Sequence, residues 1–150
     1  MNGTHVHLLV NHLPIVGSIL AGIVLAQGLW SRTEQTIAAA YSLMIISSIG
    51  GLIAFFTGES AEETAEAIEG VSRSVIHQHE ESGEFAMICA VALGLVAIVG
   101  LIVMNRRPAL SLRVAWFALV VSLVSFVSLA YTGYTGGQVR HTEVYPAAQP

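Results

Sequence analysis

Four long stretches of the chain lack charged residues and are dominated by apolar side chains. They cover residues 8–30, 37–56, 85–104 and 114–134. Each has roughly 20 residues, the helical length needed to cross about 30 Å of hydrocarbon. Inside a bilayer every backbone polar group must find a partner within the protein, so these stretches are expected to be helices. The pattern predicts an all-α integral membrane four-helix bundle, with one domain over residues 1–150.

Small residues recur at close spacing within these stretches. Gly17 and Ala21 lie four positions apart in the first, and glycines also mark the third at Gly94 and Gly100. Such positions let helix backbones approach closely in lipid, where apolar surface alone does not favour protein over acyl chains. We expect them to be packing residues.

The composition supports a membrane protein and excludes a nucleic-acid partner. Hydrophobic residues make up 54% of the chain and charged residues 11%, against about 25% charged residues in an ordinary soluble domain. The six positive charges are all arginine, the ten negative charges are all glutamate, and the net charge is −4. No basic stripe exists to follow a phosphate backbone. The single cysteine, Cys89, lies in an apolar stretch and is expected to be a buried hydrophobe.

The arginines indicate how the bundle is oriented. An even number of spans puts both termini and segment 57–84 on one side and the two short connections on the other. Those connections carry four arginines, Arg32, Arg106, Arg107 and Arg113. The positive-inside rule therefore predicts a multi-pass protein of the bacterial inner membrane with both termini periplasmic. Aromatic residues are expected at the inner interface (Trp30, Tyr41, Trp116) and at the outer one (Phe55, Phe56, Tyr131, Tyr134).

Segment 57–84 is predicted to form an outer-face loop with a short extramembrane helix between spans two and three. Gly58 can end the second span as a C′ glycine, and Ser60 with Glu63 has the spacing of a capping box. The short helix is expected over residues 61–69. The third helix is expected to start at Ser72 or Ser74, before the membrane.

Six histidines all fall at or beyond the outer ends of the spans. On the third helix His77 shares a face with Glu81 and Glu84, while His79 lies about 200° away, so only one of the two imidazoles can face the bundle. His12 stands at the mouth of the first span, where an ionisable residue is a functional candidate. Pro14 allows two geometries, with the membrane helix beginning near it or an earlier helix kinking at it.

Clustered imidazoles favour metal or haem chemistry. A b-type haem needs only two axial imidazoles from facing helices, and the candidate ligands are His7, His12, His77 and His141. His12 and His77 are the first choice of pair, and Arg140 would neutralise a haem propionate. The alternative is a non-haem iron, copper or zinc site with the same histidines and Glu59, Glu81 and Glu84 as ligands. A third hypothesis is a structural accessory subunit whose histidines only form hydrogen bonds.

Short motifs at both ends of the chain resemble those of a known family. The segment from His7 through His12 to Pro14-Ile15, and the ending Gly136-Gly137 followed by Arg140-His141, resemble the bacterial membrane family catalogued as domain of unknown function 2231. The resemblance implies a four-helix membrane domain linked to redox modules such as Rieske or haem-binding domains. It therefore favours an electron-transfer protein over a stand-alone enzyme. The expected partners are the lipid bilayer and a redox partner protein or quinone, and a homo-oligomer is compatible with the sequence.

Overall fold

The computed structural model describes residues 2–66 and 71–140, and within them every regular element is a helix. The helices are α1 (Gly3–Val10), α2 (His12–Ser31), α3 (Glu34–Glu66), α4 (Arg73–Arg106) and α5 (Pro108–Arg140). Four helical stretches are long and apolar enough to cross a membrane: Gly3–Ser31, Glu34–Glu66, Arg73–Arg106 and Pro108–Val139. The predicted all-α membrane bundle is confirmed.

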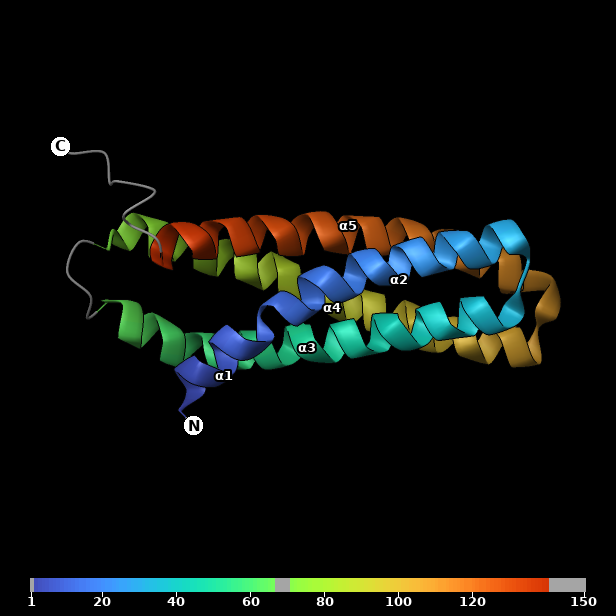
Figure 1. The fold of residues 1–150 in the computed structure, drawn as a ribbon, viewed down its shortest axis with the longest axis horizontal. Helices are drawn as coiled ribbons and strands as arrows, with labels where there is room; N and C mark the ends of the chain where they lie inside the picture. The colour runs from blue at the N-terminus through green and yellow to red at the C-terminus, as the bar shows by residue number, and fades with distance from the viewer. Residues whose placement is uncertain (1, 67–70, 141–150) are drawn as a thin grey trace.

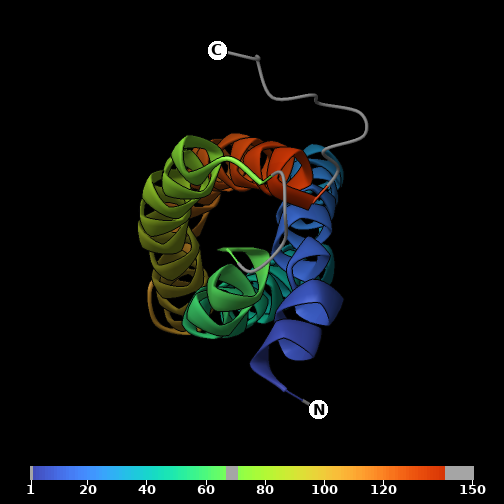
Figure 2. The same ribbon diagram turned by 90° about the vertical axis from the view of Figure 1, so that its left-hand side faces the viewer.

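The four long helices form a ring in the order α2, α3, α4, α5 (Figure 2). Neighbours in the ring pack along their length, whereas α3 and α5 barely touch across it. The short α1 lies outside the ring against α3 (Figures 1 and 2). The start of α1, the end of α3, the start of α4 and the end of α5 share one end of the bundle, which we call the outer end.

The helical conformation is interrupted at Asn11, between α1 and α2. This interruption combines the two geometries expected around Pro14. A helix does begin near the N-terminus, where the Asn2 side chain accepts a hydrogen bond from the backbone N–H of His5 at 3.0 Å. It stops at Val10, and Pro14 becomes the third residue of a new helix. The first-turn N–H groups of a helix have no intrahelical partner, so proline costs nothing there.

The expected short helix after the second span is not a separate element. The second span does not end at Gly58, because α3 continues without a break from Glu34 to Glu66. Propensity explains the difference, since Ala61, Glu62, Glu63 and Ala65 are good helix formers and one glycine costs only about 1 kcal/mol. Residues 67–70 lie outside the described part of the chain.

Small side chains and serine hydroxyls join the helices, as the sequence predicted for the glycines. Ser47 on α3 donates to the Pro14 carbonyl at 2.9 Å, and Ser125 on α5 donates to the Cys89 carbonyl at 3.0 Å. A Cβ on Gly51 would lie 2.9 Å from the Ala90 side chain. Cys89 itself is buried and free, as expected.

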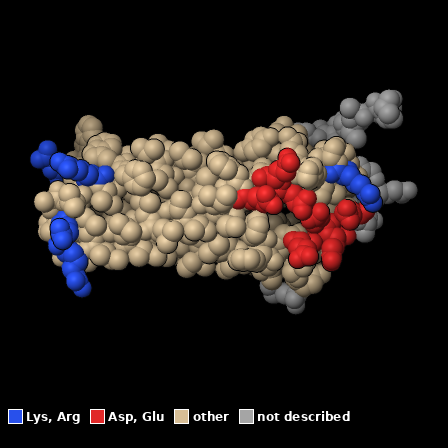
Figure 3. Space-filling model, turned by 180° about the vertical axis from the view of Figure 1, so that it is seen from behind, with Lys and Arg blue, Asp and Glu red and all other residues tan. Residues whose placement is uncertain are grey.

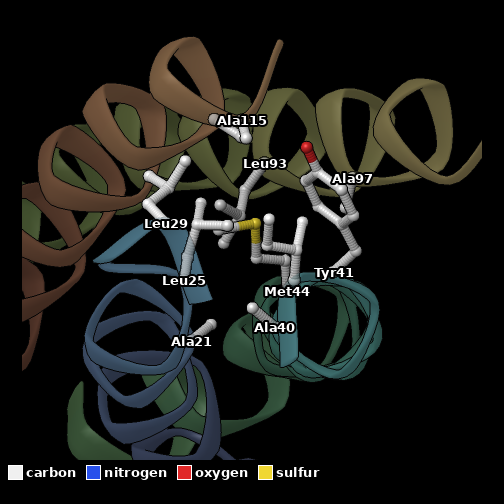
Figure 4. Packing of buried hydrophobic residues seen from close by; sticks show 11 residues of the cluster. Ala21, Leu25, Leu29, Ala40, Tyr41, Met44, Leu93, Ala97 and Ala115 are labelled. Atoms are coloured by element: carbon white, nitrogen blue, oxygen red, sulfur yellow. The ribbon is translucent and has the colours of Figure 1, made fainter. Parts of the chain in front are cut away.

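The hydrophobic core lies in the half of the bundle away from the outer end, around Tyr41, Met44, Leu25 and Leu93 (Figure 4). Tyr41 was expected at the inner interface, and this prediction is wrong because its side chain is fully buried. Gly100 makes this possible, since a Cβ there would collide with the Tyr41 ring. Trp30 and Trp116 are exposed, as interfacial residues should be.

Charge divides sharply between the two ends of the molecule (Figure 3). One end carries arginines only on the face shown, and the outer end carries glutamates together with an arginine. The middle has no charged side chain on that face. An uncharged middle between two charged ends is the surface expected of a protein that crosses a bilayer.

Candidate functional site

His79 on α4 points toward α5 and is held there by hydrogen bonds. Its Nδ1 lies 3.0 Å from the Thr132 carbonyl oxygen and 3.1 Å from Thr135 Oγ1. A carbonyl only accepts, so Nδ1 carries the proton and donates it. In the neutral ring this leaves Nε2 with a free lone pair.

The polar groups around His79 form one network across the α4–α5 seam. Ser82 Oγ donates to the His79 carbonyl at 2.8 Å and lies 3.1 Å from Thr135 Oγ1. Thr132 Oγ1 donates to the Ser82 carbonyl at 2.9 Å. Gly136 completes the seat, because a Cβ there would lie 2.9 Å from Cε1 of His79. Only glycine lets the ring lie this close to α5.

His7 on α1 is fixed in the same manner on α3. Its Nδ1 lies 2.8 Å from the Ala54 carbonyl oxygen, so this nitrogen also donates. A Cβ on Gly58, one turn further along α3, would lie 3.8 Å from Cε1 of the His7 ring. Within the described part of the chain no hydrogen bond occupies Nε2 of either His7 or His79.

The surroundings of His79 favour the neutral form of its ring. His79 lies outside the apolar 85–104 span, and desolvation lowers its pKa below the ordinary 6.5. The nearby His7 lowers this pKa further, while the hydrogen bond with Thr132 and the charge of Glu80 act in the opposite direction. A neutral imidazole whose Nδ1–H is tied to a backbone carbonyl is the form in which histidine ligates metals.

His77 takes the opposite face of α4, so the choice that the sequence left open falls on His79 as the inward residue. The His77 side chain is 70% exposed, with Nδ1 3.5 Å from Glu80 Oε2 and Nε2 3.4 Å from Glu81 Oε1. His12 is also exposed, and its Nδ1 lies 2.5 Å from Asn11 Oδ1. Neither side chain of the predicted pair His12–His77 points into the bundle, and their role as ligands stays a prediction.

The three glutamates proposed as metal ligands, Glu59, Glu81 and Glu84, are all exposed. Over residues 2–66 and 71–140 no group of three or more His, Cys, Asp or Glu side chains is arranged to hold a metal ion. His141 and the side chain of Arg140 lie outside the described part of the chain. Of the five described histidines, His7 and His79 are the two whose rings are hydrogen-bonded to another helix.

A carboxylate pair joins α3 to α4 at the outer end. Glu62 shares a hydrogen bond with Glu80, and its pKa is raised by desolvation first and by the negative charge of Glu80 second. Glu66 and Glu59 raise it further. The Glu62 carboxyl therefore keeps its proton to a higher pH than an isolated glutamate does.

The inward position of His79 could have been predicted from the apolar stripe along the third span. On α4 the buried residues include Ile76, Ala86, Ala90, Leu93 and Ala97. Stepping back from Ala86 by three and four positions along this stripe reaches Gly83, Ser82 and His79. The stripe through His77 leads instead to Ile88 and Leu95, which are exposed.

Comparison with known proteins identifies a family. A family model described as "Predicted membrane protein (DUF2231)" matches residues 3–144. No curated protein and no solved structure matches the chain. The matched segment includes all five helices and both His7 and His79. The chain belongs to the family of predicted membrane proteins described as DUF2231.

Proposed function

We propose that the protein is a b-type haem electron-transfer protein of the bacterial inner membrane, with His7 and His79 as the axial ligands. The observation that carries this proposal is the pair of imidazoles, from α1 and α4, with both Nδ1 atoms held by backbone carbonyls. In the neutral form each ring keeps an Nε2 lone pair, and His7 is close enough to His79 to lower the pKa of the His79 ring. Two axial imidazoles from different helices are sufficient protein ligands for haem in a helical bundle.

The haem hypothesis is favoured over a non-haem iron, copper or zinc site by the number of ligands. A non-haem site needs three or more protein ligands, and the carboxylates expected to supply them face solvent. A haem site needs no carboxylate. Arg140 retains its proposed role as the partner of a propionate, and His141 remains an alternative ligand.

The proposed orientation puts the arginine-rich end in the cytoplasm and the imidazoles on the periplasmic side. Electrons would then pass between a periplasmic redox protein or a quinone and the haem.

The absorption spectrum of the purified protein tests the proposal. We expect a Soret band and a sharp α-band on reduction. His7→Ala and His79→Ala should each abolish the reduced spectrum. His12→Ala and His77→Ala are matched controls, since both rings are exposed, and should keep it.

The opposite pattern, with loss in the His12 and His77 variants only, would show that the ligand pair is wrong. A colourless protein grown with ample haem would refute haem binding altogether. Elemental analysis would then separate a non-haem metal protein from a structural accessory subunit.

A further inference from the structure

An open groove of about 730 Å³ runs between α4 and α5 on the outside of the bundle. Its apolar walls include Phe85, Leu123, Val124 and Val127, and these side chains are 49–65% exposed. All four belong to the apolar spans, so the walls face the lipid tails. The groove is therefore open to molecules dissolved in the membrane.

The outer mouth of the groove is polar and uncharged except for one carboxylate. Gln78 Nε2 donates to the Tyr131 hydroxyl oxygen at 3.0 Å. That bond uses the Tyr131 oxygen as an acceptor and leaves its O–H free to donate. Glu81 also lines the mouth, with its Oε1 3.4 Å from His77 Nε2. The mouth thus offers a hydroxyl donor and a carboxylate acceptor above an apolar slot.

This arrangement suits an uncharged ring with oxygens at its edge and a long apolar tail. A phospholipid fits less well, because none of the described residues that line the groove is an arginine and the Glu81 carboxylate repels a phosphate. A ring carbonyl can accept from Tyr131, and a ring hydroxyl can donate to Glu81. We propose that the groove between α4 and α5 binds the head ring of an isoprenoid quinone or quinol, with the tail along Phe85 and Val127.

The groove and the His79 site lie at the same contact between α4 and α5. Ser82 lines the groove, and its hydroxyl donates to the His79 carbonyl and contacts Thr135. Thr135 in turn contacts Nδ1 of His79. This inference rests on the proposed function in that the bound ring would be the membrane partner of the haem, but the binding itself does not require haem.

Binding of decylubiquinone, a short-tailed benzoquinone, to the full chain in phosphatidylcholine nanodiscs tests the proposal by calorimetry. We expect saturable binding to the wild type. Tyr131→Phe removes one donor and should weaken binding about tenfold. Val127→Trp fills the slot from the lipid side and should abolish binding. Tyr134→Phe is the matched control, because Tyr134 also accepts from a glutamine, Gln138 at 3.1 Å, but does not line the groove; it should bind like the wild type.

No saturable binding, equal weakening in the two tyrosine variants, or full binding by Val127→Trp would each overturn the proposal. Displacement of the quinone by phosphatidylglycerol in the discs at equal mole fraction would also overturn the proposal, because the groove would then be a phospholipid site. The same titration on haem-free His79→Ala separates the two proposals. Quinone binding without any haem in the wild type refutes only the haem, whereas haem without quinone binding refutes only the groove.

Discussion

Two adjacent glycines in α5 show how tightly the His79 ring is held. A Cβ on Gly136 would lie 2.9 Å from Cε1 and 3.3 Å from Nδ1 of His79, whereas a Cβ on Gly137 would meet no atom within 4 Å. Replacing either glycine by alanine raises helix stability by about 0.5–1 kcal/mol. Only Gly136→Ala also pushes against the imidazole.

The size of that push follows from the contact. Carbon atoms pack at about 3.5–4.0 Å, so the ring must retreat from α5 by at least about half an ångström. Thr132 and Thr135 belong to α5 as well, so the retreat lengthens both hydrogen bonds of Nδ1. The bonds are partly buried, and losing such a bond costs about 1–3 kcal/mol. We therefore expect Gly136→Ala to be about 1–3 kcal/mol less stable than Gly137→Ala.

Denaturation of the haem-free protein in detergent, followed by circular dichroism, measures this difference. The neighbouring substitution controls for helix propensity and for position near the end of α5. If the two variants unfold at the same denaturant concentration, the ring is not seated against Gly136, and the geometry assigned to His79 is wrong.

Three further predictions concern the packing and the charge of the bundle. The pKa of His79 is lowered below 6.5 in the folded protein, so as the pH falls the unfolded chain binds a proton at this histidine before the folded chain does. The free energy of unfolding of the haem-free protein should therefore decrease below about pH 6.5, and His79→Gln should make it depend less on pH there. Gly100→Ala puts a methyl group into the buried Tyr41 ring and should destabilise the protein by about 1–3 kcal/mol in the same denaturation assay. Ser122→Ala removes the 2.7 Å hydrogen bond to the Ser18 carbonyl and should lower stability by about 0.6–1.7 kcal/mol, measured by thermal unfolding.

Matched substitutions control for each packing prediction. Gly83 lies on the same helix as Gly100, but a Cβ there would come no closer than 4.0 Å to another side chain, so Gly83→Ala should not destabilise. Ser42 is exposed and donates only within its own helix, to Ala38, so Ser42→Ala should be nearly neutral. Equal losses in test and control variants would contradict the packing described for α2, α4 and α5. A pH profile unchanged by His79→Gln would contradict the partial burial of that imidazole.

The apolar spans and the small-residue contacts were predictable from sequence because both follow from the bilayer. Length and lack of charge identified the four spans, and the spacing of Gly17, Ala21 and Gly94 identified faces where backbones approach. The continuation of α3 past Gly58 was not predicted. A glycine after an apolar span is typical of a helix end, and the good helix formers that follow Gly58 were not weighed against it. Tyr41 was misplaced for a related reason, since only the partner glycine on α4 makes room for a buried ring.

The candidate site was predictable in kind but not in its members. The sequence showed that imidazoles gather at the outer end and that His77 and His79 face opposite ways. It could not decide between them, because that depends on how α4 turns against α5. His12 was favoured for its place beside Pro14, yet the break at Asn11 turns its ring outward. His7 is held by a carbonyl forty-seven positions away, at Ala54, a contact that no local pattern contains.

Near-infrared magnetic circular dichroism of the oxidised, haem-loaded protein tests the central claim most directly, because its charge-transfer band identifies the two axial ligands of a low-spin haem. The account predicts a bis-imidazole band that disappears in both His7→Ala and His79→Ala. A band typical of any other ligand pair, or a bis-imidazole band that survives either substitution, would contradict it.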